Sequence, residues 1–132
     1  MEPTDSKSQP MARVLVADDE HVIAETLAII LRRSGYEVLV VHDGQAAVQQ
    51  AEIWKPQALL IDVIMPLLNG IDAAIQISSL LPGCRIVLIS GQGATADLLH
   101  DAGERGHFFE VLAKPVHPSE VLQRLEGLKA AA

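Results

Sequence analysis

Short apolar runs alternate with amphipathic segments from residue 13 onward, and this alternation constrains the fold more than any other feature of the chain. The runs 13–17, 37–41, 58–61, 85–89 and 108–113 are rich in valine, leucine and isoleucine, as buried strands are. Strands that are apolar on both faces need helices on both faces. With right-handed crossovers, the pattern predicts an α/β fold: a doubly wound, five-stranded parallel sheet inside a three-layer sandwich.

Helical patterns fill the segments between these runs. Residues 20–34 place apolar side chains at helical spacing, carry two arginines in the last turn and end before Gly35. Asp43 is a suitable cap for a second helix, which ends at Trp54 before a lysine-proline pair. Three further helices are expected from about residue 70 to the proline-glycine pair at 82–83, over about 95–102, and from Pro118 onward.

Polar and charged side chains stand at the carboxyl ends of four of the apolar runs. Asp18 and Asp19 follow the first run, Asp62 the third, Ser90 the fourth and Lys114 the fifth. Parallel strands bring these ends to one edge of the sheet, which is where ligands of doubly wound folds bind. The sequence therefore predicts one polar pocket that gathers these side chains.

The chemistry of such a pocket follows from its charges. Three carboxylates within a few ångströms repel one another strongly, so a compensating cation is expected. Carboxylate oxygens form the hard environment that Mg²⁺ prefers, and Mg²⁺ sites commonly keep positions open for phosphate oxygens. Zinc is not expected, because the chain has one cysteine and no histidine pair at ligand spacing. With Lys114 and Ser90 on the phosphate oxygens, Asp62 is free to attack phosphorus.

Composition narrows the class of protein. The 132 residues, 49% of them hydrophobic, suit one domain, which we place at 12–130 after a disordered leader over 1–11. A formal net charge of −7 and only 3% aromatic residues argue against nucleic-acid partners and against anionic membrane surfaces. The lone Cys84 excludes an intrachain disulfide, and no apolar run is long enough to cross a bilayer, so a cytoplasmic location is expected.

The order of the pocket residues resembles a known family. The match covers nearly the whole chain, about residues 12–130, and its most specific part is an aspartate followed by Met-Pro and then Gly. The arrangement is similar to the receiver domain of bacterial two-component response regulators. The residues that carry the resemblance are Asp18-Asp19, Asp62 with Met65-Pro66 and Gly70, Ser90-Gly91 and Lys114-Pro115.

This resemblance implies a flavodoxin-like (βα)5 fold and a role for each pocket residue. Asp62 would be the phosphoacceptor, and Ser90 and Lys114 would contact the phosphoryl group. A cis peptide bond is implied before Pro115. The implied Mg²⁺ ligands are Asp18, Asp19, Asp62 and the backbone carbonyl of Ile64.

The resemblance also implies partners. A histidine kinase or a histidine phosphotransfer protein would donate the phosphoryl group, and a downstream output protein would read the change, or the phosphate would pass onward in a phosphorelay. Because only four residues follow Leu128, we expect a stand-alone receiver, a monomer or weak dimer, that catalyses only its own phosphorylation and dephosphorylation. Two alternatives stay open: a docking module independent of phosphorylation, and a haloacid dehalogenase-type phosphotransferase, whose usual second aspartate is Ile64 here.

The chain departs from the receiver pattern in two places. Receivers usually carry tyrosine or phenylalanine three residues before the lysine, where this chain has Val111. Period-two alternation places Phe109 on the same side as Val111 and Phe108 toward the opposite layer, so Phe109 is the candidate substitute. Receivers also often carry polar residues at the positions of Ile64 and Gln92, which leaves the lifetime of the acyl phosphate open.

Overall fold

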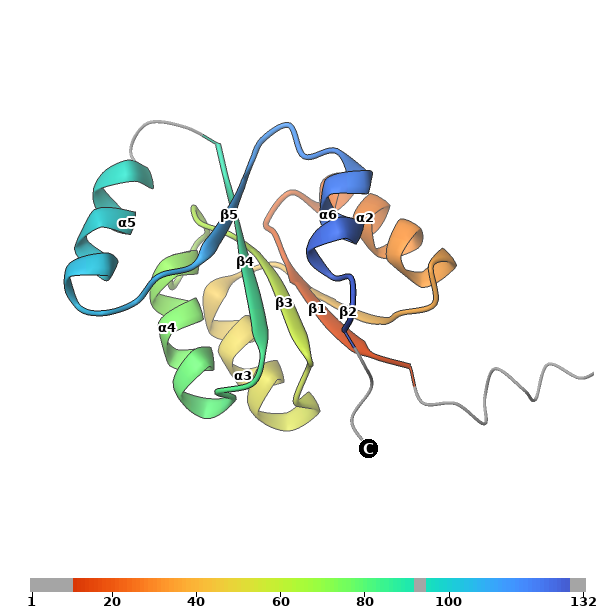
Figure 1. Ribbon diagram of the computed structural model, residues 1–132, viewed down its shortest axis with the longest axis horizontal. Coiled ribbons are helices and arrows are strands. Elements are labelled where there is room, and N and C mark those ends of the chain that lie inside the picture. Colours follow the sequence, from red (N-terminus) through yellow and green to blue (C-terminus); the bar gives the residue numbers. More distant parts are fainter. Residues whose placement is uncertain (1–10, 92–94, 129–132) are drawn as a thin grey trace, which may run out of the picture.

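The computed structural model describes residues 11–91 and 95–128, and its strands form one parallel sheet (Figure 1). Within these residues the sheet has five strands in the order β2-β1-β3-β4-β5, and every neighbouring pair is parallel. The predicted doubly wound sheet is therefore confirmed. The strands are β1 (Arg13–Ala17), β2 (Glu37–Val41), β3 (Ala58–Asp62), β4 (Arg85–Ser90) and β5 (Glu110–Ala113).

Helices cover both faces of the sheet, which gives the predicted three-layer sandwich. Three helices pack on one face and two on the other (Figure 1). The first group is α3 (Gly44–Trp54), α4 (Gly70–Leu80) and α5 (Thr95–Glu104), and the second is α2 (His21–Arg33) and α6 (Pro118–Arg124). No helix in the described part of the chain is both long and apolar enough to span a lipid bilayer.

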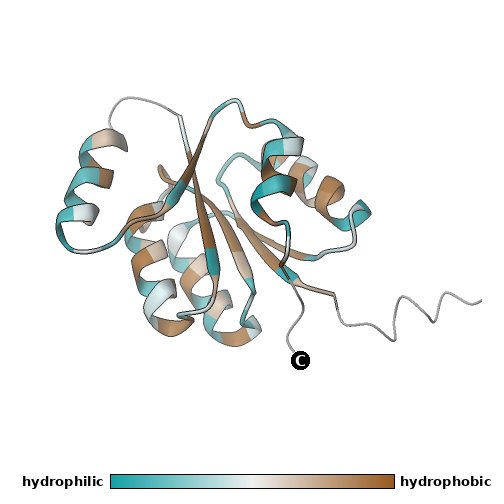
Figure 2. Cartoon of the chain, viewed as in Figure 1, coloured by the Kyte–Doolittle hydropathy of each residue, from teal (hydrophilic) through white to brown (hydrophobic). Residues whose placement is uncertain are grey.

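The strands are apolar on both faces because each of them is covered on both faces. In β1, Leu15 and Ala17 belong to the core on the α3–α5 side, whereas Val14 and Val16 belong to the core on the α2–α6 side. The strands accordingly show as mostly brown ribbons in Figure 2. Burying each large aliphatic side chain contributes about 1.5–3 kcal/mol, so the two cores together drive the folding of the sandwich.

Several helix ends lie where the sequence predicted them. Helix α2 ends before Gly35, whose φ of +99° favours glycine. The side chain of Asp43 caps α3 by accepting a hydrogen bond from the Ala46 amide at 2.7 Å. Asn69 caps α4 in the same way through the Asp72 amide at 2.9 Å.

The last strand is shorter than predicted, and one prediction based on it is wrong. Strand β5 begins at Glu110, so Phe108 and Phe109 precede it and strict alternation does not apply to them. Phe108 does not enter the opposite layer: it is 83% exposed, and its ring lies beside Gly103 of α5. Phe109 is half-buried and packs against the same core as Val111, as expected.

Some expectations lie outside the described residues. These include the disordered leader, apart from Met11, and the end of the predicted domain at 129–130. Gln92, which was considered for orienting water, lies there as well. The predicted domain limits therefore stay predictions.

Candidate functional site

The carboxyl ends of β1, β3, β4 and β5 bring four of the predicted residues to one edge of the sheet. Strands β3 and β4 each run one residue further than predicted, so that Asp62 and Ser90 are their last residues. Asp18 directly follows β1, and Lys114 directly follows β5. The chain winds from β1 toward β2 on one side and β3 on the other, so this edge includes the switch point at which doubly wound folds bind ligands.

Asp62 and Lys114 form an ion pair in the middle of this edge. The Lys114 Nζ donates to Asp62 Oδ2 at 2.8 Å, and Asp62 is only 3% exposed. Partial burial lowers the pKa of the Lys114 ammonium, but the hydrogen bond and charge of Asp62 and the charge of Asp18 outweigh this effect and raise the pKa overall. Lys114 is therefore protonated and positively charged at neutral pH.

Of the main-chain features around this pair, the cis peptide bond before Pro115 was expected. The Lys114 amide donates to the Ser90 carbonyl at 2.8 Å, which joins the ends of β4 and β5, and the peptide bond before Pro115 is cis. The Ile64 amide donates to Asp62 Oδ1 at 3.2 Å and thereby lies beside the carboxylate. The Ile64 carbonyl as a metal ligand and the Ser90 hydroxyl as a phosphate contact stay predictions.

Asp18 has the least favourable surroundings of the acids in the site. It is fully buried, and its Oδ1 accepts a hydrogen bond from the Glu20 amide at 2.9 Å, whereas its Oδ2 is buried without a partner among the described residues. Burial raises the pKa of Asp18, and the negative charges of Asp62 and Glu20 add to this effect, which the Glu20 amide and the Lys114 charge only partly oppose. A buried carboxylate oxygen without a hydrogen-bond partner favours the binding of a cation.

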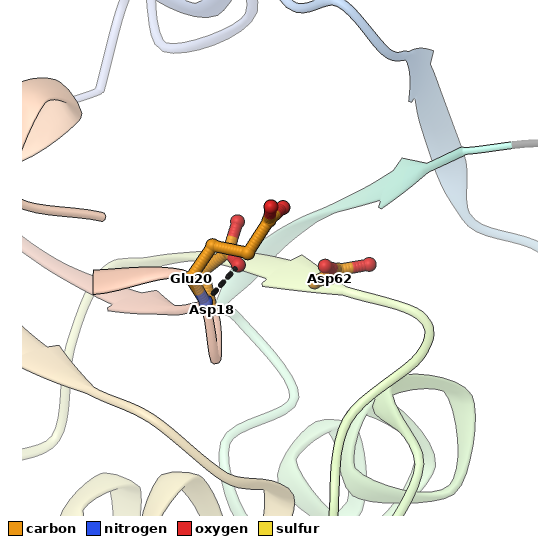
Figure 3. A group of neighbouring side chains, drawn as sticks. All are labelled: Asp18, Glu20 and Asp62. Carbon is orange, nitrogen blue, oxygen red and sulfur yellow. Dashed lines mark hydrogen bonds between the residues drawn. The ribbon is translucent and has the colours of Figure 1, made fainter. Parts of the chain in front are cut away.

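The acids that cluster at this edge differ from the predicted set. Asp18, Glu20 and Asp62 each offer an oxygen within 4.8 Å of the others, and Figure 3 shows these side chains gathered at the strand ends. Asp19 is exposed and lies outside this cluster, so its predicted metal role remains untested. Sequence reasoning missed Glu20 because this residue was taken as the start of a helix. Two features could have identified it as a pocket residue: it lies beside the aspartate pair, and its side chain is poorly suited to capping a helix.

The cluster fits the magnesium ion that was predicted. All its donors are hard oxygens, one buried oxygen of Asp18 has no partner in the part of the chain that the structure describes, and Lys114 balances one of three negative charges. Mg²⁺ prefers such oxygen ligands and leaves room for phosphate oxygens and water. Asp18, Glu20 and Asp62 are the residues that could hold it.

The close packing around Gly70 explains why a glycine follows the Asp-x-x-Met-Pro motif. A Cβ atom at Gly70 would lie 2.0 Å from the Asp62 carbonyl oxygen, a distance that no side chain tolerates. The Gly70 amide also donates to the Val63 carbonyl at 2.7 Å. The start of α4 thus packs directly on the strand end that carries the central carboxylate and holds it in place.

An apolar groove adjoins this edge. It has a volume of about 710 Å³ and runs between α2 and the segment that links β5 to α6, with Lys114 in its wall. Two of the large aliphatic side chains that line it are exposed, Val22 at 80% and Ile23 at 38%. The groove and the acidic pocket therefore share Lys114.

Comparison with known proteins agrees with this geometry. The family model of the response regulator receiver domain matches residues 14–126, which includes every predicted pocket residue. The chain belongs to the response regulator receiver family. This receiver also resembles solved receivers in fold: a response regulator receiver domain from Clostridium thermocellum superposes with a TM-score of 0.79 at 26% identity, covering 89% of this chain and 94% of that one.

Two further relatives bear on the site and the architecture. The receiver domain of a sensor histidine kinase from Pseudomonas aeruginosa, solved with magnesium coordinated in its active site cleft, has a TM-score of 0.71 and 27% identity, and covers 89% of this chain and 97% of that one. The transcriptional regulatory protein PdtaR of Mycobacterium tuberculosis is 38% identical over 125 residues, which are 93% of this chain. The chain spans 59% of the length of PdtaR.

Proposed function

We propose that this receiver accepts a phosphoryl group on Asp62 in a Mg²⁺-dependent reaction and signals through phosphorylation-dependent contacts with other proteins. The observation that carries the proposal is the ion pair of the buried Asp62 with Lys114 at 2.8 Å, beside an Asp18 carboxylate with one oxygen that has no partner among the described residues. The pair places a nucleophile and a fixed cation together, and the unpaired oxygen leaves a place for a metal. Magnesium in the related kinase receiver supports the same choice of ion.

The residues of the site suit an in-line transfer. A carboxylate oxygen of Asp62 forms a bond to phosphorus, the bond from phosphorus to the donor's imidazole nitrogen breaks, and that nitrogen keeps the electron pair. Lys114 neutralises charge on the phosphoryl oxygens, and the Ser90 hydroxyl donates to another of them. Asp18, Glu20 and Asp62 would hold Mg²⁺, which would further neutralise the charge of the phosphoryl group. Later attack by water on phosphorus restores the free Asp62 carboxylate.

The apolar groove supports a protein donor. A donor histidine must come within bonding distance of Asp62, so the donor has to cover the surface around Lys114, where the groove begins. An amphipathic helix of a histidine kinase or of a histidine phosphotransfer protein fits a groove lined by exposed aliphatic side chains. We propose that the phosphodonor protein binds in this groove.

We propose two routes for the output of the receiver. The surface built from α5, β5 and α6 is the candidate reading face for a downstream protein, and onward transfer to a phosphotransfer protein is the other route. We propose a cytoplasmic receiver, a monomer or weak dimer, with no catalysis beyond its own phosphorylation and dephosphorylation. The stand-alone architecture stays a prediction, because relatives such as PdtaR are longer than this chain.

One experiment separates the proposal from its alternatives. The protein is incubated with Mg²⁺ and acetyl phosphate or a phosphoramidate, and its intact mass is followed with time. We expect a single acid-labile phosphate that is absent in Asp62→Ala and in the presence of a chelator. Steady hydrolysis of phosphate esters would indicate a phosphotransferase of the haloacid dehalogenase type, and the absence of any adduct would indicate a docking module.

A further inference from the structure

Glu20 occupies the cap position of α2 without capping the helix. Its backbone is extended, and its side chain accepts no hydrogen bond from the first turn. Serine, threonine, asparagine or aspartate is the usual residue at this position, because a short side chain reaches the free amides. The longer Glu20 side chain instead extends over the pocket toward the end of β3 (Figure 3).

There Glu20 meets the cation of the site. Glu20 Oε1 lies 3.3 Å from Lys114 Nζ, and the same Nζ lies 2.8 Å from Asp62 Oδ2. Lys114 is 25% exposed, whereas Glu20 is 57% exposed, so the Glu20 contact is the outer of the two. One ammonium group therefore bridges the carboxylate at the end of β3 and the carboxylate that follows the neighbouring strand β1.

A phosphoryl group on Asp62 changes this arrangement. An ammonium has three donors, and Asp62 and Glu20 already engage it from two directions. The phosphoryl oxygens bring new negative charge to the same ammonium and compete for it with the weaker, more exposed partner. Since Glu20 is that partner, its contact is the one that gives way.

We propose that Glu20 is a positioning residue that holds Lys114 in the unphosphorylated protein and is displaced from it by the incoming phosphoryl group. This inference rests on the proposed function. Glu20 then slows phosphorylation, because its contact with Lys114 must break before the ammonium reaches the phosphate. It acts through Lys114 rather than through its charge alone.

The charge and the contact are separated by two substitutions. Glu20→Gln removes the charge and the ion pair, while Glu20→Asp keeps the charge but withdraws it from Lys114 by one methylene. Glu25→Gln, on an exposed position of α2, is the matched control. Phosphorylation of each variant by acetyl phosphate is followed by mass spectrometry at saturating Mg²⁺, so that any change in metal affinity does not affect the comparison.

We expect both Glu20 variants to be phosphorylated about two- to fivefold faster than the wild type, the range of a partly exposed ion pair, and Glu25→Gln to be unchanged. The proposal would be overturned if Glu20→Gln were phosphorylated at the wild-type rate. It would also be overturned if Glu20→Gln were faster while Glu20→Asp kept the wild-type rate. A second measurement does not depend on phosphorylation: the ¹⁵N shift of Lys114 Nζ in the metal-free protein should move in both Glu20 variants and not in Glu25→Gln. An unmoved shift overturns the proposal, whereas a moved shift in a protein that takes up no phosphate at Asp62 overturns only the proposed function.

Discussion

At the scale of single residues, the site is organised around a carboxylate that the fold alone leaves unsatisfied. Asp18 is fully buried with one oxygen unpaired, and its pKa is raised by burial and by the neighbouring acids. Asp62, in contrast, has Lys114 at 2.8 Å. Keeping three acids together therefore lowers the stability of the folded state mainly through Asp18, and substitutions of Asp18 should measure this effect.

Asp18→Asn should stabilise the metal-free protein by about 1–2 kcal/mol, because it removes a buried unpaired charge without changing the shape of the side chain. The Glu20 amide would still find an oxygen acceptor. Urea unfolding in the presence of a chelator measures the change. The matched control is Asp19→Asn, which is exposed and should shift stability by less than about 0.5 kcal/mol. A destabilised Asp18→Asn variant would contradict this account of the site.

The same effect should depend on pH. The folded-state pKa of Asp18 is raised, so its ionised form costs stability at neutral pH, and that cost is relieved as the pH falls through the folded-state pKa. The advantage of Asp18→Asn over the wild type should therefore be largest near neutral pH and shrink on acidification. Unfolding curves of the two proteins at several pH values give this difference directly.

Cys84 is predicted to be chemically inert in the folded protein. Burial raises the pKa of its thiol to about 12, and the thiolate is the reactive form. At pH 8 only about one thiol in ten thousand would be ionised. Labelling by a disulfide reagent should therefore be slow in the native protein and rapid in denaturant, and rapid native labelling would show that the thiol is more accessible than its half-buried position indicates.

At the scale of elements, the junction between β3 and α4 couples stability to the site. Gly70→Ala should cost about 2–3 kcal/mol, because its Cβ would collide with the Asp62 carbonyl and force the start of α4 to shift. The same shift should slow phosphorylation. Gly83→Ala is the matched control, since a Cβ there meets nothing within 4 Å, and it should leave both stability and phosphorylation nearly unchanged.

The groove between α2 and the β5–α6 segment allows donor docking to be separated from chemistry. Val22→Asp places a charge on an 80% exposed residue of the groove and should slow transfer from a phosphorylated histidine protein by about tenfold, the typical effect at an interface anchor. Phosphorylation by acetyl phosphate should be unaffected.

Ile53→Asp is the control for this experiment. Ile53 is 75% exposed on α3 and does not line the groove. Equal slowing in both variants, or slowing with acetyl phosphate as well, would mean that Val22 does not act through donor docking.

At the scale of the whole molecule, metal binding should be linked to folding. The acidic cluster forms only when β1 and β3 are side by side, so Mg²⁺ should bind the folded state preferentially. At a concentration 100 times its Kd, Mg²⁺ should add about 2.7 kcal/mol of stability and raise Tm accordingly. Asp18→Asn should lose most of this effect, and an unchanged wild-type Tm would count against the metal site. Asp19→Ala tests its predicted role separately.

Sequence alone was sufficient for the sheet, its helical cover and four residues of the pocket. Apolar runs such as Leu59 to Ile61 can be buried on both sides only in a covered parallel sheet, and such a sheet brings residues that follow its strands to one edge. Asp18, Asp62, Ser90 and Lys114 were found in this way. The start of β5 was not, because the first residues of a strand depend on pairing with a neighbour rather than on composition.

Only the folded chain shows which of the acids belong to the cluster. Along the sequence Asp19 and Glu20 are equivalent neighbours of Asp18, but the turn into α2 leaves Asp19 exposed and directs Glu20 toward Lys114, a residue 94 positions away. Such a contact depends on how β5 is placed beside β4 and on the direction in which a helix starts. Local patterns predict which side chains reach the edge of the sheet, whereas packing sets which of them touch.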